Sequence, residues 1–387
     1  MPLALLVGAL AACGTDPSPI AIEEADPTRS ATAPRPSQPE AATVSIAAVG
    51  DVMFARTVGE AMVEGGLDAA FAGVGDTLRE ADIAFANLEM ALTERGEPAP
   101  KDFTFRAPPS FGPALVGAGI DVVSLANNHI MDYGPEGLFD TLVSLELLGV
   151  KGTGAGASRE AAVKPAIVES KGIRVAFLAF ASCRNDSVSG FEARSFEAGE
   201  TTPGIAWAEV DRITQAVRDA RAQADVVVVS FHWGDEYRHE VSEEQQALAY
   251  TAVDSGAQLV LGHGPHVLQG WEARGEALIV YSLGNFVFDL DDVDRSVPGL
   301  PSVNTLVLQV EVGPSGTVSA SYVPVLIDEA TGFPHRAEGP EELRVRQLVE
   351  ALSPTVADAV AALQLSAQTR GASKGGVTRD PVAAPGN

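Results

Sequence analysis

Residues 122–134 read VVSLANNHIMDYG, and this stretch indicates how the chain folds. A short apolar, β-branched run ends in Asn127, Asn128 and His129, and a helical pattern opens at Gly134. A strand followed by polar residues and then by a helix is the repeating unit of α/β proteins. This stretch therefore predicts a strand whose carboxyl end presents side chains for chemistry.

The same unit recurs between residues 43 and 327, which predicts an α/β fold. Continuous apolar runs of this kind are typical of strands that are buried on both faces of a sheet. The runs and the polar residues that follow them are 44–49 before Asp51, 83–86 before Glu89, 122–125 before Asn128, 226–231 before His232, 259–261 before His263 and His266, and 278–283 before Asn285. Residues 305–312 and 318–327 alternate around a Pro-Ser-Gly turn, so an antiparallel hairpin makes the predicted sheet mixed.

These polar residues predict a metal site. In open α/β sheets, ligands bind beyond the carboxyl ends of the strands. Carboxylate, amide and imidazole groups suit Mn, Fe or Zn, and their number here suits one or two divalent ions. Thiolates are not expected to contribute, because Cys183 is the only cysteine in this part of the chain.

The charge of the chain limits its partners. The 387 residues include 52 Asp and Glu against 26 Lys and Arg, a net charge of -26. So acidic a protein is not expected to bind nucleic acid or anionic lipid as its main partner. It would bind a polyanion only where bound cations neutralise the site.

The two ends of the chain differ from its centre. Residues 1–13 form an apolar run too short to span a bilayer, which predicts a signal peptide. Its last four residues resemble a bacterial lipoprotein box, so Cys13 is the expected site of lipidation, with a plain secretory signal as the alternative. Residues 14–42 and 366–387 are polar and rich in small residues, which predicts a flexible tether and a disordered tail. The folded domain is expected over residues 43–330 and a helical segment over 331–365.

Seven motifs carry a family resemblance. They are Ala48–Met53, Ala86–Glu89, Phe105–Pro109, Ser124–Gly134, Ser230–Gly234, Gly262–Val267 and Tyr281–Phe286. Together, and in this order, they resemble the CapA family of bacterial poly-γ-glutamate capsule synthesis proteins (PGA_cap), a branch of the metallophosphatase-like superfamily. The resemblance covers about three quarters of the chain. It implies a four-layer αββα sandwich of two mixed β-sheets flanked by helices.

The resemblance also implies a set of site residues. Carried over by matching motif, the candidate metal ligands are Asp51, Glu89, Asn128, His232, His263 and His266. His129 would protonate a leaving group or stabilise a transition state. Asp132 would either hold the His129 ring by a hydrogen bond or cap the following helix.

Two departures from the superfamily pattern leave the number of ions open. Met53 stands where the first motif usually has a histidine, and a thioether is a poor ligand for a hard cation. The closing histidines are His263 and His266, whereas many relatives place one at the position of Gly264. Either two ions bind, or one of the two positions is weak or empty.

Two further residues are candidates for binding substrate. Arg106 follows Phe105 and precedes a Pro-Pro turn, so its guanidinium could bind a carboxylate or phosphate, or form a salt bridge that holds the loop. Asn285 is expected to end the last core strand, where it could bind substrate or merely turn the chain.

The expected function is that of a CapA-type extracytoplasmic protein, held on the cell membrane by its lipid. It would act in the synthesis, export or attachment of poly-γ-glutamate or a related anionic envelope polymer, beside capsule-synthesis membrane proteins. The expected chemistry is metal-dependent hydrolysis or transfer at an amide or phosphoester. Two alternatives remain: a non-catalytic scaffold that binds polymer or membrane partners with a structural or degenerate metal site, and a phosphodiesterase unrelated to capsule.

Overall fold

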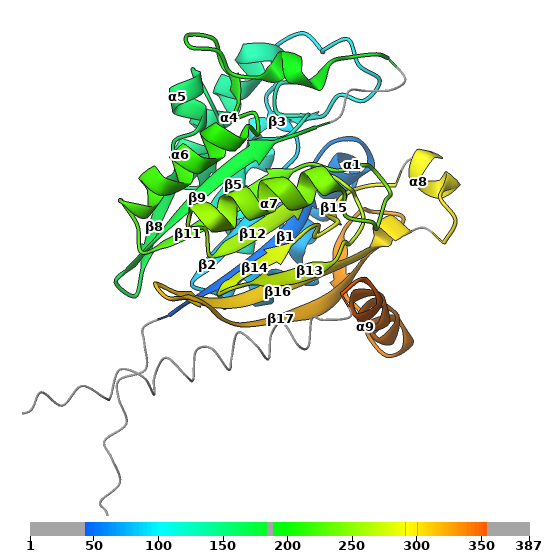
Figure 1. Cartoon of the computed structure of the whole chain (residues 1–387). Coiled ribbons are helices and arrows are strands. Elements are labelled where there is room, and N and C mark those ends of the chain that lie inside the picture. The colour runs from blue at the N-terminus through cyan, green and yellow to red at the C-terminus, as the bar shows by residue number, and fades with distance from the viewer. Residues whose placement is uncertain (1–42, 184–188, 291, 300, 354–387) are drawn as a thin grey trace, which may run out of the picture. The chain divides into compact units, whose positions relative to one another are not determined.

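The computed structural model describes residues 43–183, 189–290, 292–299 and 301–353. Its centre is two stacked β-sheets (Figure 1). The first sheet has the order β18-β17-β16-β1-β2-β5-β6, and β15 also pairs with β1. Its strands are β1 (Val44–Val52), β2 (Ile83–Leu88), β5 (Val122–Ser124), β6 (Lys151–Thr153), β15 (Asn285–Val287), β16 (Asn304–Gly313), β17 (Gly316–Ile327) and β18 (Pro334–Arg336).

The second sheet has the order β13-β14-β12-β11-β9-β8. Its strands are β8 (Ala166–Ser170), β9 (Ile173–Ala181), β11 (Val226–His232), β12 (Leu259–His263), β13 (Trp271–Arg274) and β14 (Ala277–Val280). Both sheets are mixed, because β1 is parallel to β2 and antiparallel to β16, while β12 is parallel to β14 and β13 is antiparallel to it. Two short pairs lie outside the sheets, β3 (Ala91–Leu92) with β4 (Arg106–Ala107) and β7 (Ala155–Gly156) with β10 (Gly204–Ile205).

Helices cover the outer face of each sheet (Figure 1). Those that follow strands of the first half of the chain are α1 (Arg56–Gly65), α2 (Gly75–Arg79), α3 (Pro113–Ala118), α4 (Gly134–Leu148) and α5 (Arg159–Ala162). α6 (Val210–Arg221) and α7 (Glu243–Ser255) cover the second sheet, α8 is Asp292–Ser296, and α9 (Pro340–Leu352) packs Val345 and Val349 into the core between the sheets. Within the described residues, no helix is both long and apolar enough to cross a membrane.

Alternation along the strands explains the layers. In β1, Ile46 contributes to the core between the sheets, whereas Ala47 contributes to the core under α1–α4. In β11, Val228 faces the core between the sheets and Val229 faces α6 and α7. Side chains of successive strand residues point to opposite faces, so strands apolar at every position can bury both. The predicted four-layer αββα sandwich of two mixed sheets is confirmed.

The two sheets are joined by an apolar core that includes a pair of aromatic rings. Phe85 of β2 and Phe177 of β9 stack with their centroids 5.5 Å apart and an interplanar angle of 9°. Both side chains are fully buried. Aromatic pairs of this kind bury a large apolar area, so this contact helps to hold one sheet against the other.

The predicted hairpin is also present. β16 and β17 pair antiparallel from Asn304↔Leu326 to Gly313↔Gly316, with Pro314 and Ser315 in the turn. Gly316 has φ 125°, a conformation that side chains disfavour, which explains a glycine at that place. The predicted lipidation site at Cys13, the tether 14–42 and the tail 366–387 lie outside the described residues, as does the part of segment 331–365 beyond Ser353.

Candidate metal centre

The predicted ligands come from strands of two different sheets. In the first sheet, Asp51 is paired in register with Asn87 of β2 and with Asn285 of β15. In the second sheet, His232 is paired with His263 across β11 and β12. The sequence pattern suggests a single sheet edge for these strand ends, but the stacking of two sheets brings two edges together. Asp51 and His263 touch across them, with 3.3 Å between Oδ1 and Nδ1.

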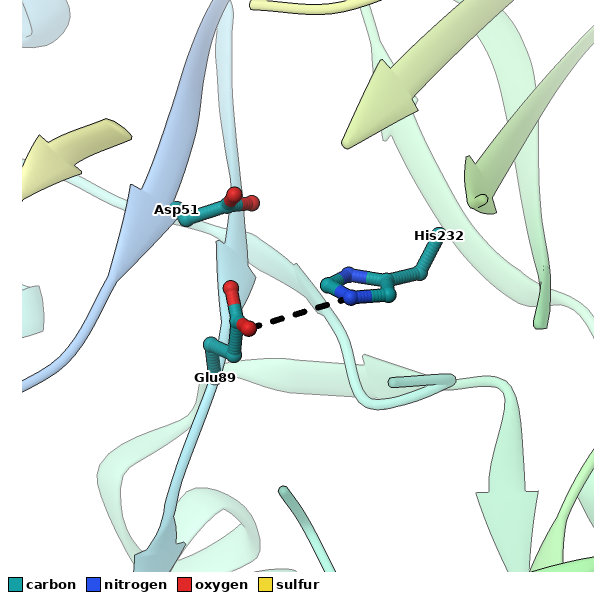
Figure 2. Close-up of side chains that lie close together, drawn as sticks. All are labelled: Asp51, Glu89 and His232. Atoms are coloured by element: carbon teal, nitrogen blue, oxygen red, sulfur yellow. Dashed lines mark ion pairs between the residues drawn. The ribbon is translucent and has the colours of Figure 1, made fainter. Parts of the chain in front are cut away.

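Three ligand candidates form the centre of the cluster. Figure 2 shows Asp51, Glu89 and His232 pointing toward one another, and one ligand atom from each lies within 4.8 Å of the others. All three are buried. The dashed line marks the 3.7 Å between Glu89 Oε1 and His232 Nε2. Two carboxylates and an imidazole at this spacing form a donor set for a divalent cation.

The closing histidines lie on the Asp51 side of this cluster. His266 Nδ1 is 3.7 Å from Asp51 Oδ2 and 2.7 Å from Asn285 Oδ1. Since an amide oxygen only accepts, His266 donates its Nδ1 proton to Asn285 and keeps a lone pair on Nε2. The prediction that Asn285 ends the last core strand is wrong. Asn285 begins β15, because the chain leaves the second sheet after β14 and adds this residue to the first sheet, beside Asp51.

His129 lies on the opposite side of the cluster, next to Glu89. Its Nε2 is 3.9 Å from Glu89 Oε1, and its Nδ1 is 2.7 Å from Asp132 Oδ2. The ring stacks on Phe105 with centroids 4.0 Å apart. Helix α4 has no side-chain cap at its N-terminus, so of the two predicted contacts of Asp132 the structure contains the one to the His129 ring.

Two residues of the cluster were not predicted. The Asn87 amide nitrogen is 2.9 Å from Asp51 Oδ1 and 3.3 Å from His232 Nδ1. Its place two residues before Glu89 in a strand-end motif was a usable signal. The Lys101 ammonium donates to the Asn128 carbonyl at 2.6 Å and pairs with Asp132 Oδ1 at 2.8 Å. Lys101 lies in a loop with no apolar periodicity, so nothing in its neighbourhood signalled a role.

Burial and mutual charge shift the pKa values of the cluster in both directions. Burial, and then the charge of Asp51, raise the pKa of Glu89 well above its usual range. Burial also acts to raise the pKa of Asp51, but contacts with His263, His232 and His266 outweigh it and lower that pKa.

The imidazoles respond to burial as well. Burial lowers the pKa of His232 to about 3 and, with the Lys101 charge, that of His129 to about 4. Burial acts to lower the pKa of His266 too, but Glu236 and Asp51 raise it overall. Neutral His232 and an ionised Asp51 are the protonation states that bind a metal.

Polar atoms without partners indicate that a cation fits the cluster. Among the described residues, Glu89 Oε1, Asn128 Oδ1 and His263 Nε2 are buried and have no hydrogen-bond partner. An unsatisfied buried acceptor costs about 1–3 kcal/mol, and coordination of a cation would offset that cost for each atom that binds it. Met53 offers nothing in place of the usual histidine: it is fully buried, and its sulfur accepts the Ala55 amide at 2.9 Å.

Arg106 lies outside this network. It is exposed on β4, with its guanidinium 4.3 Å from the centroid of the Tyr133 ring. The salt bridge that the sequence offered as an alternative role for Arg106 does not occur within the described residues. Cys183 is a free, half-buried thiol after β9, with a pKa raised by burial.

Comparison with known proteins gives consistent matches. The family described as bacterial capsule synthesis protein PGA_cap matches residues 45–290. The PGA biosynthesis protein CapA of Bacillus subtilis (strain 168) is 32% identical over 294 residues, which cover 75% of this chain and 73% of that protein. The capsule biosynthesis protein CapA of Bacillus anthracis is 32% identical over 292 residues, covering 74% and 68%.

Solved structures give weaker matches. A phosphatase from Mycoplasma pneumoniae superposes with a TM-score of 0.47 and 12% identity, covering 79% of this chain and 97% of that one. A hypothetical protein from Thermus thermophilus gives a TM-score of 0.45 and 19% identity, covering 72% and 98%.

Proposed function

The chain belongs to the PGA_cap family of bacterial capsule synthesis proteins, and from this premise we propose that it is a metal-dependent hydrolase or transferase of the cell envelope. Its substrate would be poly-γ-glutamate or a related anionic polymer. The observation that carries the proposal is the buried group of Asp51, Glu89 and His232. Glu89 Oε1, which has no hydrogen-bond partner among the described residues, lies at the centre of that group, between two histidines.

The residues that would hold one or two divalent ions (Mn, Fe or Zn) are Asp51, Glu89, Asn128, His232, His263 and His266. An ion there would supply Lewis-acid activation of water and of the bond to be cut. Asn285 would act through His266, because its amide oxygen determines which nitrogen of that ring stays unprotonated. Asn87 would hold Asp51 and His232 in their relative positions.

His129 is the group that would move a proton. Its Nδ1 proton is donated to Asp132, so the lone pair on Nε2 faces Glu89 and the cluster. A histidine in this state can take a proton from an attacking group and return it to a leaving amine or alcohol. Stacking on Phe105 keeps the ring in one orientation.

Arg106 would bind the polymer. It follows Phe105, which stacks on His129, so its exposed guanidinium lies in the segment next to the cluster. Each unit of poly-γ-glutamate carries a carboxylate beside the amide that links it to the next unit. A guanidinium pairs well with such a carboxylate, and bound cations would offset the acidity of the chain.

The proposed place of action is outside the cytoplasm, with the chain held at the membrane by a lipid on Cys13. The lipoprotein-box pattern at residues 10–13 supports this location, and the names of the CapA relatives support an association with capsule-synthesis machinery. Incorporation of a labelled fatty acid into the wild-type chain, and its absence from Cys13→Ser, is the expected result.

A second candidate function is a scaffold with a structural metal site. Met53 favours it, because its sulfur is committed to the Ala55 amide and leaves the first motif without its usual imidazole. A centre that holds its ion weakly could bind polymer without cutting it.

Metal content and hydrolysis, measured on the same samples of the full chain, separate the two candidates. Wild type is compared with the double variant Asn128→Ala, His232→Ala and with His335→Ala, an exposed histidine outside the cluster, as the matched control. Substrates are poly-γ-glutamate and a chromogenic phosphodiester. We expect near-stoichiometric Mn, Fe or Zn and hydrolysis in wild type and control, and neither in the double variant.

Each other outcome has one meaning. Hydrolysis of the phosphodiester alone would identify a phosphodiesterase instead. Metal binding without any hydrolysis would support the second candidate, a scaffold with a structural metal site. A folded wild type that binds no supplied metal would exclude both metal-based proposals.

A further inference from the structure

Lys101 is a buried cation beside the proposed proton-moving histidine. Its side chain is only 5% exposed, although lysine is almost never buried without a partner. The ammonium lies 2.6 Å from the Asn128 carbonyl oxygen, 2.8 Å from Asp132 Oδ1 and 3.2 Å from His129 Nδ1. These three contacts all fall on the segment 128–132. Lys101 therefore contacts the segment 128–132, which includes the ligand candidate Asn128 as well as His129 and Asp132.

The loop that carries Lys101 is itself bonded to the same segment. The Ala99 amide donates to the Asp132 carbonyl at 2.7 Å, and the Phe105 amide donates to Asp132 Oδ2 at 2.7 Å. Bonds on both sides of Lys101 thus hold its ammonium against Asp132. Its position is set by the backbone rather than by a flexible side chain alone.

The contact between Asp132 and His129 determines which nitrogen of the His129 ring carries the proton. An ionised carboxylate can only accept, so the 2.7 Å contact between Asp132 Oδ2 and His129 Nδ1 requires a proton on Nδ1. Lys101 cannot also donate to that nitrogen, and its 3.2 Å approach follows from its bonds to Asp132 and Asn128. By pairing with Oδ1, Lys101 balances the charge of Asp132 and leaves Oδ2 to the ring.

We propose that Lys101 is a positioning residue that acts through Asp132 to hold the His129 ring in one orientation, with Nδ1 donating to Asp132 and Nε2 facing Glu89. Without the ammonium, Asp132 becomes a buried carboxylate whose Oδ1 has lost its cation. With its ion pair lost, the carboxylate can rotate away from the ring, and the ring can turn so that Nε2 no longer faces Glu89. The proposal rests on the proposed function for its catalytic meaning, but the ring state can be measured without any activity.

The test uses the full chain labelled with ¹⁵N-histidine and supplied with Zn²⁺, which is diamagnetic. The chain has six histidines, so the His129 ring signals can be assigned by their absence in His129→Gln. Spectra of wild type, Lys101→Met and Lys101→Arg are compared. Lys171→Met is the matched control, because Lys171 also pairs with an aspartate, Asp82, but its side chain is 57% exposed.

We expect wild type, Lys101→Arg and Lys171→Met to show the Nδ1–H tautomer of His129. In Lys101→Met the His129 signals should move toward a mixture of the Nδ1–H and Nε2–H tautomers while the other rings stay unchanged. Hydrolysis, where wild type has it, should fall about 10–100-fold in kcat at constant KM and metal content. A merely structural role would change all the rings, or KM and metal content, together.

Unchanged His129 signals in folded Lys101→Met overturn the proposal, whether or not wild type hydrolyses anything. Failure of the proposed function alone appears as absence of hydrolysis with the expected ring states. If Lys101→Met does not fold, Lys101→Gln, which can still donate to the Asn128 carbonyl but carries no charge, provides the same reading: the Nδ1–H tautomer must give way to a mixture there, and its unchanged persistence overturns the proposal.

Discussion

The two sheets bring different chemistry to the cluster. The first supplies carboxylates and an amide, from Asp51, Glu89 and Asn128, and the second supplies imidazoles, from His232, His263 and His266. Burial raises the pKa of Glu89 on one side and lowers the pKa of His232 on the other. Neither sheet alone provides a balanced donor set. The centre is therefore a property of the interface between the sheets, and each prediction below tests one side of it.

The largest expected effect is the loss of bound metal when either side loses one donor. Glu89→Gln removes a charge from the first sheet and His232→Ala removes an imidazole from the second. Both variants should purify with little Mn, Fe or Zn by elemental analysis, because each takes one donor from the three-residue centre. Full metal content in either variant would mean that this residue is not a ligand.

His129 is the exception to the comparison, since it is an imidazole supplied by the first sheet. It contacts Asp132 and lies farther from Glu89 than His232 does. His129→Gln should keep its metal and lose about 10²–10⁴-fold in kcat, the usual contribution of a general acid or base. Metal loss in this variant would instead make His129 a ligand like those of the second sheet.

The contact between the sheets can be weakened away from the cluster. Phe85→Ala removes one ring of the stacked pair with Phe177 and should lower the free energy of unfolding by about 3–5 kcal/mol in a urea titration. Leu147→Ala is a control, because Leu147 is 84% exposed and should change stability little. If the centre belongs to the interface, Phe85→Ala should also bind metal more weakly than the control does.

The smallest effect concerns the metal-stripped protein. There Glu89→Gln should raise the free energy of unfolding by about 1–3 kcal/mol, because burial and the charge of Asp51 disfavour the ionised carboxylate, and the amide that replaces it carries no charge. His232→Ala should show no such gain, since the imidazole is neutral when buried. If both variants change the free energy of unfolding by the same amount, the two sheets do not differ in the electrostatic cost of their buried groups.

The fold could be predicted from the sequence because its central strands are apolar at nearly every position up to their polar ends. Such strands need cover on both faces, and the motif order identified the family whose fold provides it. The site could be predicted in outline for a related reason. Polar residues that directly follow buried strands lie at the ends of the sheets, where they can gather in one site.

The positions of Asn285 and Lys101 and the contacts of Met53 could not be predicted from the sequence pattern. The chain passes from the second sheet to the first just before Asn285, and no periodic pattern in the sequence marks such a crossing. Lys101 reaches the site from a loop between two two-residue strands, where no apolar pattern exists to place it. The contacts of Met53 also depend on tertiary packing, although its departure from the motif was visible.

The pairing of Asp51 with Asn285 has a consequence for the order of events during biogenesis. These neighbours in space lie near the beginning and the end of the folded core, and closure of such distant contacts is a late and slow step. No partial chain that lacks β11 and β12 holds the full donor set, so a ribosome-bound fragment has no complete centre to fill. Under the proposed function, the metal would be selected from the ions available where the final strands dock, and not where synthesis begins.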